Sequence, residues 1–374
     1  MKKNNIISVN VVKPNCEYVN AYTHGGVFHA DEVMATAILA NFKDINVARV
    51  FKVDDVDEKT AIVYDIGGGE FDHHQKGGNG FHEGTMIPYA ACGLIWREFG
   101  HDVVRKFAEN NEDGDYWFND ATIDGIVKTI DKVLIQGIDA VDNGCAFGGS
   151  PNDYAMFTVS NMVALMNPNW DADSDSDSMF TRAVYLCSEI LQNLMASEFS
   201  KAKAAKYVAD FYNHSDNHIM VMDKFLPWQE ALDAIENEQF KDGNNKNIWY
   251  VIFPSNRGGF NMQCVPLTPG SFGQKAPLPE AWKGNADATG VEGCTFIHPA
   301  GFIGACDTLE HAMALATKAA AYNRALIGMR RLGCDEPEAI DKAMAIAEMT
   351  AKAYNEQTDM QEYAKAVVNT VLNK

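Results

Sequence analysis

Three short segments of the chain carry histidine and aspartate at spacings that suit a metal site. They are THGGVFHADE at 23–32, YDIGGGEFDHH at 64–74 and GIDAVDNG at 137–144. Their candidate ligands are His24, His29, Asp31, Asp65, His73, Asp139 and Asp142, with Asp72 and His74 beside them. Imidazole and carboxylate groups without cysteine suit manganese, iron or zinc, and carboxylate shells completed by water suit magnesium. The pattern therefore predicts a divalent-metal site.

Two of the aspartates have positions that favour a site for two ions. Asp65 ends an apolar run, and its two carboxylate oxygens could each face one ion, which makes it a natural bridge. Asp31 lies in the first turn of an expected helix, whose dipole keeps a carboxylate ionised. Paired metals about 3.5–4 Å apart serve in-line attack at phosphorus. The chemistry expected from this site is hydrolysis of a phosphate ester.

Each segment alone also has a structural explanation. The segment with His24 and His29 could combine a helix cap with surface histidines, and Asp65 could cap the glycine turn that follows it. Asp139 and Asp142 lie one helical turn apart and could form an exposed face. Adjacent histidines in an extended chain point to opposite sides, so at most one is a ligand and the other faces substrate. The joint occurrence of the three segments, which hold four of the ten histidines, favours the site.

Apolar runs and helical patterns place the three segments in an α/β fold. Strands are expected at 17–23, 47–53 and 61–66, and helices at 30–42, 86–100 and over much of 120–139. Strands that alternate with helices predict a mostly parallel sheet with flanking helices. Ligands of such sheets bind outside the carboxyl ends of the strands, so we expect the three segments to converge there.

A polar stretch at 167–178 marks an expected domain boundary. Its aspartates resemble a calcium loop, but Ser176 stands where that loop needs glycine and Arg182 where it needs glutamate. A solvated loop with a helix cap is the interpretation we favour. A linker helix at 178–213 is expected to follow, and then a smaller C-terminal α/β domain. Its elements are expected as strands at 218–222, 247–254, 259–266 and 294–298 and helices at 228–237 and 307–331, before a helical tail at 335–374.

Composition limits the class of protein. A chain of 374 residues with 47% apolar and 22% charged residues predicts a globular protein of two domains. Its apolar runs are too short to span a bilayer, and its start shows no secretory signal. The eight cysteines are scattered without a CxxC pair, which favours reduced thiols and a cytoplasmic location. The net charge of −20 argues against broad adhesion to nucleic acid, although it leaves open a phosphate substrate held by metal.

The order of the motifs resembles that of the DHH phosphoesterase superfamily. The series is HxxxxHxD, a strand that ends in Asp-Gly-Gly, DHH and a later aspartate pair. More closely, the chain resembles the Myg family (melanocyte proliferating gene proteins), older members of which were named metal-dependent protein hydrolases. The segments that carry this resemblance are THGGVFHADEVMATAIL, FDHHQ, IDAVDNG, DKFLPWQEAL, PLPEAWKG and GCTFIHPAGFIGA, in the expected order over about residues 20–325.

The resemblance implies a DHH-type domain, expected at 15–170, followed by a linker at 171–215 and a smaller substrate-binding domain at 216–331. A helical extension at 332–374 is expected outside the resemblance. The resemblance also implies two divalent ions, Mn²⁺ or Mg²⁺, and 3′–5′ exonuclease activity on RNA or short oligonucleotides. By superfamily analogy, one ion would be held by His24, His29 and Asp65. The other would be held by Asp31, Asp65, His73 and either Asp139 or Asp142, while His74 would touch the scissile phosphate and Asp72 would orient its neighbours.

Two positions depart from the family pattern. Phe28 stands where the wider superfamily has an aspartate, and Gln274 and Lys275 stand where the family tends to carry an arginine. Lys275 could still serve a phosphate as a point charge.

Four further residues stand out in the sequence. His298, followed by Gly301, is expected to contact substrate phosphate, with a strand-terminal surface histidine as the alternative. Trp228 and Trp282 could stack on a base or pack between elements. Outside this set, His82 is expected to be a bystander.

Three functions fit these observations. The first is an exonuclease with two metals, and the second is a small-molecule phosphatase or pyrophosphatase on the same site. The third is a metal-binding protein without activity, which the crowding of mutually repelling carboxylates argues against. A protein hydrolase has no support, because the chain lacks HExxH and a nucleophile signature. The sequence leaves open the length of the substrate, the native metal and whether the chain forms a homodimer.

Overall fold

The computed structural model describes residues 6–52, 61–76, 78–110, 118–145 and 156–356, with side chains described to residue 350. It divides into two compact units, Met1–Phe199 and Ser200–Lys374. The boundary between them falls within the expected linker, whereas the finer domain limits stay predictions.

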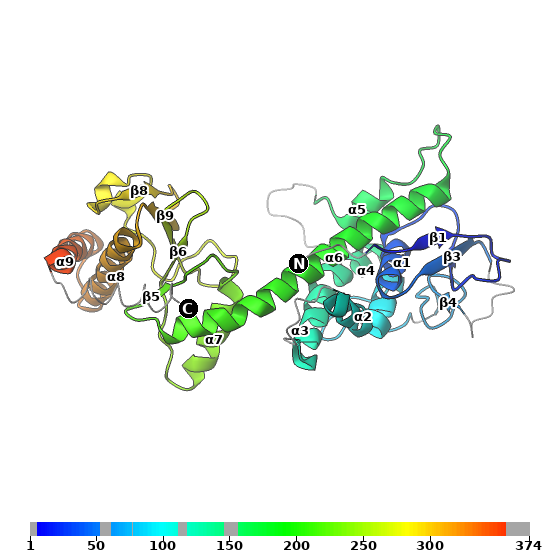
Figure 1. Ribbon diagram of the computed structural model, residues 1–374, viewed down its shortest axis with the longest axis horizontal. Coiled ribbons are helices and arrows are strands. Elements are labelled where there is room, and N and C mark those ends of the chain that lie inside the picture. The colour runs from blue at the N-terminus through cyan, green and yellow to red at the C-terminus, as the bar shows by residue number, and fades with distance from the viewer. Residues whose placement is uncertain (1–5, 53–60, 77, 111–117, 146–155, 357–374) are drawn as a thin grey trace. The chain divides into compact units, whose positions relative to one another are not determined.

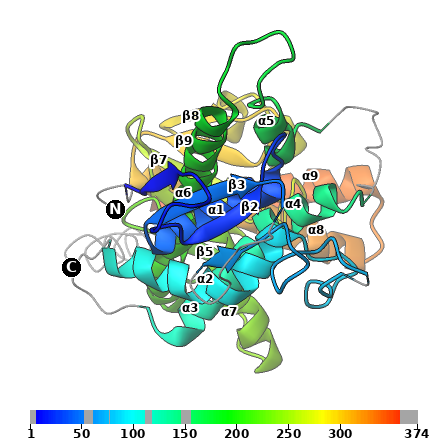
Figure 2. The same ribbon diagram turned by 90° about the vertical axis from the view of Figure 1, so that its right-hand side faces the viewer.

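The first unit contains a parallel sheet of four strands in the order β1-β3-β2-β4. The strands are β1 (Val9–Val11), β2 (Ala21–His24), β3 (Ile45–Val50) and β4 (Ile62–Val63). Helix α1 (Ala30–Phe42) packs against β3 and against α2 (Ala91–Asn110) (Figure 2). Because α1 is apolar on nearly every side, it is buried from Ala30 to Asn41. The expected α/β class is confirmed.

Four further helices in the described part of this unit pack on this pair. They are α3 (Asp120–Ile130), the π-helix η1 (Asp131–Ile135), α4 (Gln136–Asp142) and α5 (Val159–Ala164). Of these, α4 and α5 contact α1, while α3 and η1 pack against α2. The expected single helix over 120–139 is thus interrupted by a π turn, a feature that recurs at functional sites. Strand β4 is shorter than expected because the chain turns sharply at Asp65, whose φ is 57°. Strand β1 was not expected.

Helix α6 (Ser176–Asn213) begins two residues before the expected linker helix and ends at the same residue. The Asp175 carboxylate accepts a hydrogen bond from the Ser178 backbone N–H at 2.9 Å, as an N-cap residue does. The cap favoured over a calcium loop is therefore present. No helix within the described part of the chain is long and apolar enough to cross a membrane.

The second unit contains a mixed sheet in the order β5-β6-β7-β9-β8. Strands β5 and β6 pair in parallel, and the other pairs are antiparallel. The elements are β5 (Ile219–Val221), α7 (Gln229–Lys241), β6 (Tyr250–Pro254), β7 (Phe260–Cys264), η2 (Glu280–Trp282), η3 (Asp287–Thr289), β8 (Cys294–Ile297), β9 (Ile303–Cys306), α8 (Leu309–Arg331) and α9 (Glu336–Glu356).

The core of the second unit contains the two tryptophans singled out in the sequence. Trp228 and Trp282 are both buried, so each packs inside the unit and neither presents a face to a base. Helix α9 packs along α8 and falls within the expected C-terminal extension (Figure 1). The rest of that extension, 357–374, lies outside the described residues.

Candidate metal centre

The carboxyl edge of the parallel sheet brings the first two segments together. Strand β2 ends at His24, and Asp65 follows β4, which pairs with β2. The His24 Nε2 atom lies 3.2 Å from Asp65 Oδ2 and 3.0 Å from Glu32 Oε1. Glu32 also accepts the His29 backbone N–H at 2.8 Å. The start of α1 is thereby tied to the ends of two strands.

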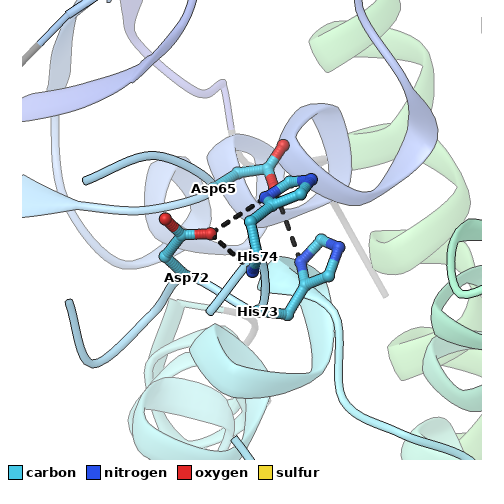
Figure 3. Close-up of side chains that lie close together, drawn as sticks. All are labelled: Asp65, Asp72, His73 and His74. Carbon is cyan, nitrogen blue, oxygen red and sulfur yellow. Dashed lines mark hydrogen bonds and ion pairs between the residues drawn. The ribbon is translucent and has the colours of Figure 1, made fainter. Parts of the chain in front are cut away.

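The second segment forms a tight loop around Asp72. Its carboxylate accepts backbone N–H groups from Gly68 at 2.7 Å and His74 at 3.0 Å, and lies 2.9 Å from the His74 ring (Figure 3). Burial raises the pKa of Asp72, but these hydrogen bonds outweigh it and lower the pKa below its ordinary value. Asp72 therefore stays ionised and fixes the loop.

The adjacent histidines have different surroundings. The His73 side chain is 10% exposed, and its Nε2 lies 3.0 Å from Asp142 Oδ2. The His74 side chain is 61% exposed, and its Nδ1 faces Asp72. Both rings approach the same Asp65 oxygen, at 3.5 and 3.4 Å (Figure 3). One imidazole thus lies inside the cluster and the other at its surface.

The two aspartates of the third segment, Asp139 and Asp142, lie in different surroundings. Asp142 reaches the cluster, because His29, Asp31 and Asp142 offer ligand atoms within 4.8 Å of one another. Asp139 lies elsewhere and is fully buried. It accepts hydrogen bonds from the Gly93 backbone N–H at 3.1 Å and from His82 Nε2 at 2.8 Å. The structure brings Asp142, and not Asp139, to the other candidate ligands.

His82 links α4, the helix that carries Asp139 and Asp142, to η1. Its other ring nitrogen lies 3.0 Å from Asp131, the first residue of η1, and Gln136 donates to the same carboxylate at 2.7 Å. The imidazole therefore joins the start of η1 to the middle of α4 at Asp139. Far from being a bystander, His82 holds the helix that carries Asp142.

Several polar side-chain atoms in the cluster are buried without a hydrogen-bond partner. Within the described residues, both Asp31 oxygens, Asp65 Oδ1 and His73 Nδ1 have no hydrogen-bond partner. Burial, followed by the charge of Asp65, raises the pKa of Asp31 well above its ordinary value. Buried polar atoms without a hydrogen-bond partner are costly, and bound cations would compensate these atoms. The residues present fit a divalent-metal site.

A cavity of about 730 Å³ opens onto the cluster. The cluster lines it with His24, His29, Asp31, Asp65, His73, His74 and Asp142, and α4 and α5 contribute Ile138, Val141, Ser160, Asn161 and Ala164. This volume lies within the range of small-molecule and cofactor pockets, so there is room for a phosphate and the groups beside it.

The expected substrate residues of the second unit have local partners. Lys275 forms an ion pair with the buried Glu236, so its charge is already compensated. His298 Nδ1 accepts the Ala300 N–H at 3.0 Å, and Gly301 has a φ of 69° and packs against Lys283. His298 and Gly301 share the turn between β8 and β9, and their contact with substrate stays a prediction.

Two residues of this centre were missed from the sequence. Glu32 stands three residues after His29 at the start of α1, which is the spacing of a capping box and could have signalled it. His82 meets Asp131 and Asp139 from 49 and 57 residues away, and no local pattern announces such a contact.

Comparison with known proteins gives one family. The family model MYG1_exonuc, described as "Uncharacterised protein family (UPF0160)", matches residues 20–320. The MYG1 exonuclease of Rattus norvegicus is 32% identical over 327 residues, which cover 79% of this chain and 82% of the relative. The MYG1 exonuclease of Homo sapiens is 30% identical over 326 residues, covering 79% and 84%. A MYG1 protein of Schizosaccharomyces pombe is 29% identical over 327 residues, covering 80% and 97%. No solved structure matches the chain.

The close approach of Asp139 to α2 makes Gly93 a test of this packing. A Cβ at Gly93 would lie 1.9 Å from Asp139 Oδ2 and 2.9 Å from His82 Nε2. We expect Gly93→Ala to lower the free energy of unfolding in urea by roughly 1–3 kcal/mol. The matched control is Gly125→Ala in α3, where nothing lies within 4 Å, and which should be neutral or stabilising by up to about 1 kcal/mol. Equal stability of the two variants would contradict the contact.

Protons and cations compete for the same atoms of the cluster. Burial lowers the pKa of His24, but hydrogen bonds to Asp65 and Glu32 outweigh it and raise the pKa from 6.5 to about 10. Below about pH 10 a binding ion must therefore displace a proton, so affinity for Mn²⁺ should rise with pH across the neutral range. Calorimetry in two buffers with different ionisation enthalpies should show proton release. Affinity that does not change with pH would contradict this arrangement.

Proposed function

The chain belongs to the MYG1 exonuclease family, and we propose that it is a divalent-metal-dependent phosphodiester hydrolase that acts as a 3′–5′ exonuclease on RNA or short oligonucleotides. The observation that carries this proposal is the cluster of buried carboxylate and imidazole groups, several of whose atoms have no hydrogen-bond partner, at the carboxyl edge of the parallel sheet. The relatives named MYG1 exonuclease support the same class of chemistry.

Two divalent ions, Mn²⁺ or Mg²⁺, would be held by residues from all three segments. His24, His29 and Asp65 would hold one, and Asp31, Asp65, His73 and Asp142 the other. Asp65 suits a shared ligand because its Oδ2 faces His24 while its Oδ1 faces the histidine pair. Bound metals of this kind lower the pKa of water and neutralise charge that develops on a phosphate.

The residues around the metal ligands would orient them and the substrate. Glu32 holds His24 and the backbone of His29, so it fixes two ligands at once. Asp72 holds the Nδ1 side of His74, which leaves the exposed imidazole at the cavity wall to contact the scissile phosphate. The repelling charges of the buried carboxylates also argue against a scaffold role, because a scaffold gains nothing from them.

An exposed aromatic ring supports a substrate that carries a base, in preference to pyrophosphate. Phe51 directly follows Val50, the last residue of β3. Val50 is in register with His24 on β2, and neighbouring strands lie about 4.8 Å apart. The Phe51 side chain is 82% exposed. Its ring packs against Gly25 and Gly26, where added Cβ atoms would lie 3.3 and 3.4 Å away. Aromatic rings in single-strand-binding proteins stack on bases, and the exposed Phe51 ring could serve a base in this way.

The proposed substrate also names the main partner of the chain. An RNA or oligonucleotide would be the main partner, bound at the cavity of the first unit. A cytoplasmic location and a homodimer stay predictions.

A substrate panel tests the proposal directly. Chelator-treated protein should be inactive, and added Mn²⁺ should restore removal of nucleotides from a 5′-labelled RNA, with no cleavage when the 3′ end is blocked. Activity that survives complete removal of metal would overturn the metal mechanism. Release of phosphate from pyrophosphate alone would overturn the nuclease and favour the pyrophosphatase.

The two aspartates of the third segment should have separable effects. We expect Asp142→Asn to lower turnover more than about 100-fold, beyond the loss usual for outer-shell partners, while the melting temperature stays near that of the natural protein. Asp139→Asn should lower the melting temperature, because it weakens the contacts with His82 and Gly93, and should keep measurable Mn²⁺ binding. The reverse pattern would assign the metal to Asp139.

Phe51 offers a test of base recognition. Loss of a stacked base costs about 1–3 kcal/mol, so Phe51→Ala should raise KM for an oligonucleotide about 5- to 150-fold. Hydrolysis of an abasic strand, which keeps the sugar-phosphate backbone and lacks bases, should be unchanged. Phe272→Ala, at a side chain that is 98% exposed in the second unit, is the matched control. Equal losses on both substrates would contradict the stacking role.

A further inference from the structure

Two cysteines of the second unit lie directly opposite each other. Cys294 begins β8, Cys306 ends β9, and the two residues pair across this antiparallel ladder. They are 12 residues apart in the sequence, and their spacing matches no motif. The facing position comes from the hairpin register, which a bulge between Cys294 and Phe296 sets.

The hydrogen bonds beside the pair define its geometry. The Asp307 N–H donates to the Gly293 carbonyl at 3.0 Å, and the Cys294 N–H donates to Val291 instead of Cys306. The cysteines therefore occupy the site next to a hydrogen-bonded pair, where opposed Cα atoms lie about 4.5 Å apart. Disulfides bridge Cα atoms roughly 4.4–6.8 Å apart, so the backbone already has the required spacing.

The two thiols differ in access and are in contact. Cys306 is buried in the core of the unit, whereas Cys294 is half-buried and packs against the same core. The hydrogen bond from the Cys306 thiol outweighs burial and lowers the pKa of Cys294 to about 7. The same contact, with burial, raises the pKa of Cys306. The more accessible sulfur is thus the better nucleophile, with a resolving thiol behind it.

We propose that Cys294 and Cys306 form a reversible disulfide by exchange with a low-molecular-weight disulfide such as oxidised glutathione. The Cys294 thiolate attacks one glutathione sulfur, which breaks that S–S bond, forms a mixed disulfide and releases one glutathione thiolate. Cys306 loses its proton to solvent, attacks the Cys294 sulfur and releases the second glutathione. Two protein thiols are oxidised and one glutathione disulfide is reduced to two thiols.

The bond would close the base of the β8–β9 hairpin. The turn of that hairpin carries His298 and Gly301, so oxidation would restrict the segment expected to meet substrate. This modification does not depend on the proposed function, because neither cysteine belongs to the metal centre.

Peptide mapping of the folded protein tests the proposal. The full chain is incubated with oxidised glutathione, acidified, unfolded, treated with N-ethylmaleimide and digested with trypsin without reduction. No lysine or arginine separates the two cysteines, so the tryptic peptide 284–318 contains both and no other cysteine. We expect this peptide to carry no maleimide and to be lighter by two hydrogens than the reduced peptide. Chymotrypsin, which cleaves between the cysteines at Phe296 and Phe302, should leave two linked fragments.

Matched variants make the result specific. Cys294→Ala should leave Cys306 reactive with maleimide after unfolding, whereas Cys334→Ala should leave the crosslink intact. Two maleimides on peptide 284–318, or a stable glutathione adduct on Cys294 beside a free Cys306, would overturn the proposal. In glutathione buffers, the folded protein should also oxidise at a higher ratio of reduced to oxidised glutathione than the guanidinium-unfolded chain. Equal midpoints would show that the hairpin register contributes nothing.

Discussion

Buried negative charge at one edge of a parallel sheet is the constraint on which the first unit depends. Asp31, Glu32 and Asp65 offer oxygens within 4.8 Å of one another, and all three are buried. Each ion removed from water costs several kcal/mol, and like charges at this distance add to that cost. The surrounding imidazoles offset part of it, but atoms of Asp31 and Asp65 still have no hydrogen-bond partner. Bound cations would provide the remaining compensation.

The elements around this charge hold it in place. Two neighbouring parallel strands end at the cluster, and the first turn of α1 contributes carboxylates where the helix dipole favours them. The Asp72 loop supports the histidine pair from one side. His82 contacts both Asp131 of η1 and Asp139 of α4. The position of Asp142 therefore depends on a contact made one helical turn earlier in the same helix. The packing contact at Asp139 and the candidate ligand Asp142 therefore belong to the same helix.

Much of this centre could be predicted from the sequence, because its ligands come from short motifs next to strands and helices. His24, Asp65 and His73 were named on that basis and lie together. The choice between Asp139 and Asp142 could not be made, since residues one turn apart have the same local pattern and only a distant histidine separates their roles. The facing cysteines of β8 and β9 were equally hidden, because a bulge sets their register. Antiparallel pairing in the second unit also depends on contacts between distant segments, which strand propensities do not specify.

The left-handed backbone conformation of Asp65 restricts which residues suit this position. A φ of 57° is readily adopted by glycine, asparagine and aspartate, and it excludes most longer side chains. An anionic oxygen ligand is supplied by aspartate or glutamate. Only aspartate satisfies both conditions, although the two are unrelated in origin. The backbone conformation and the carboxylate chemistry of this position therefore favour the same residue, aspartate.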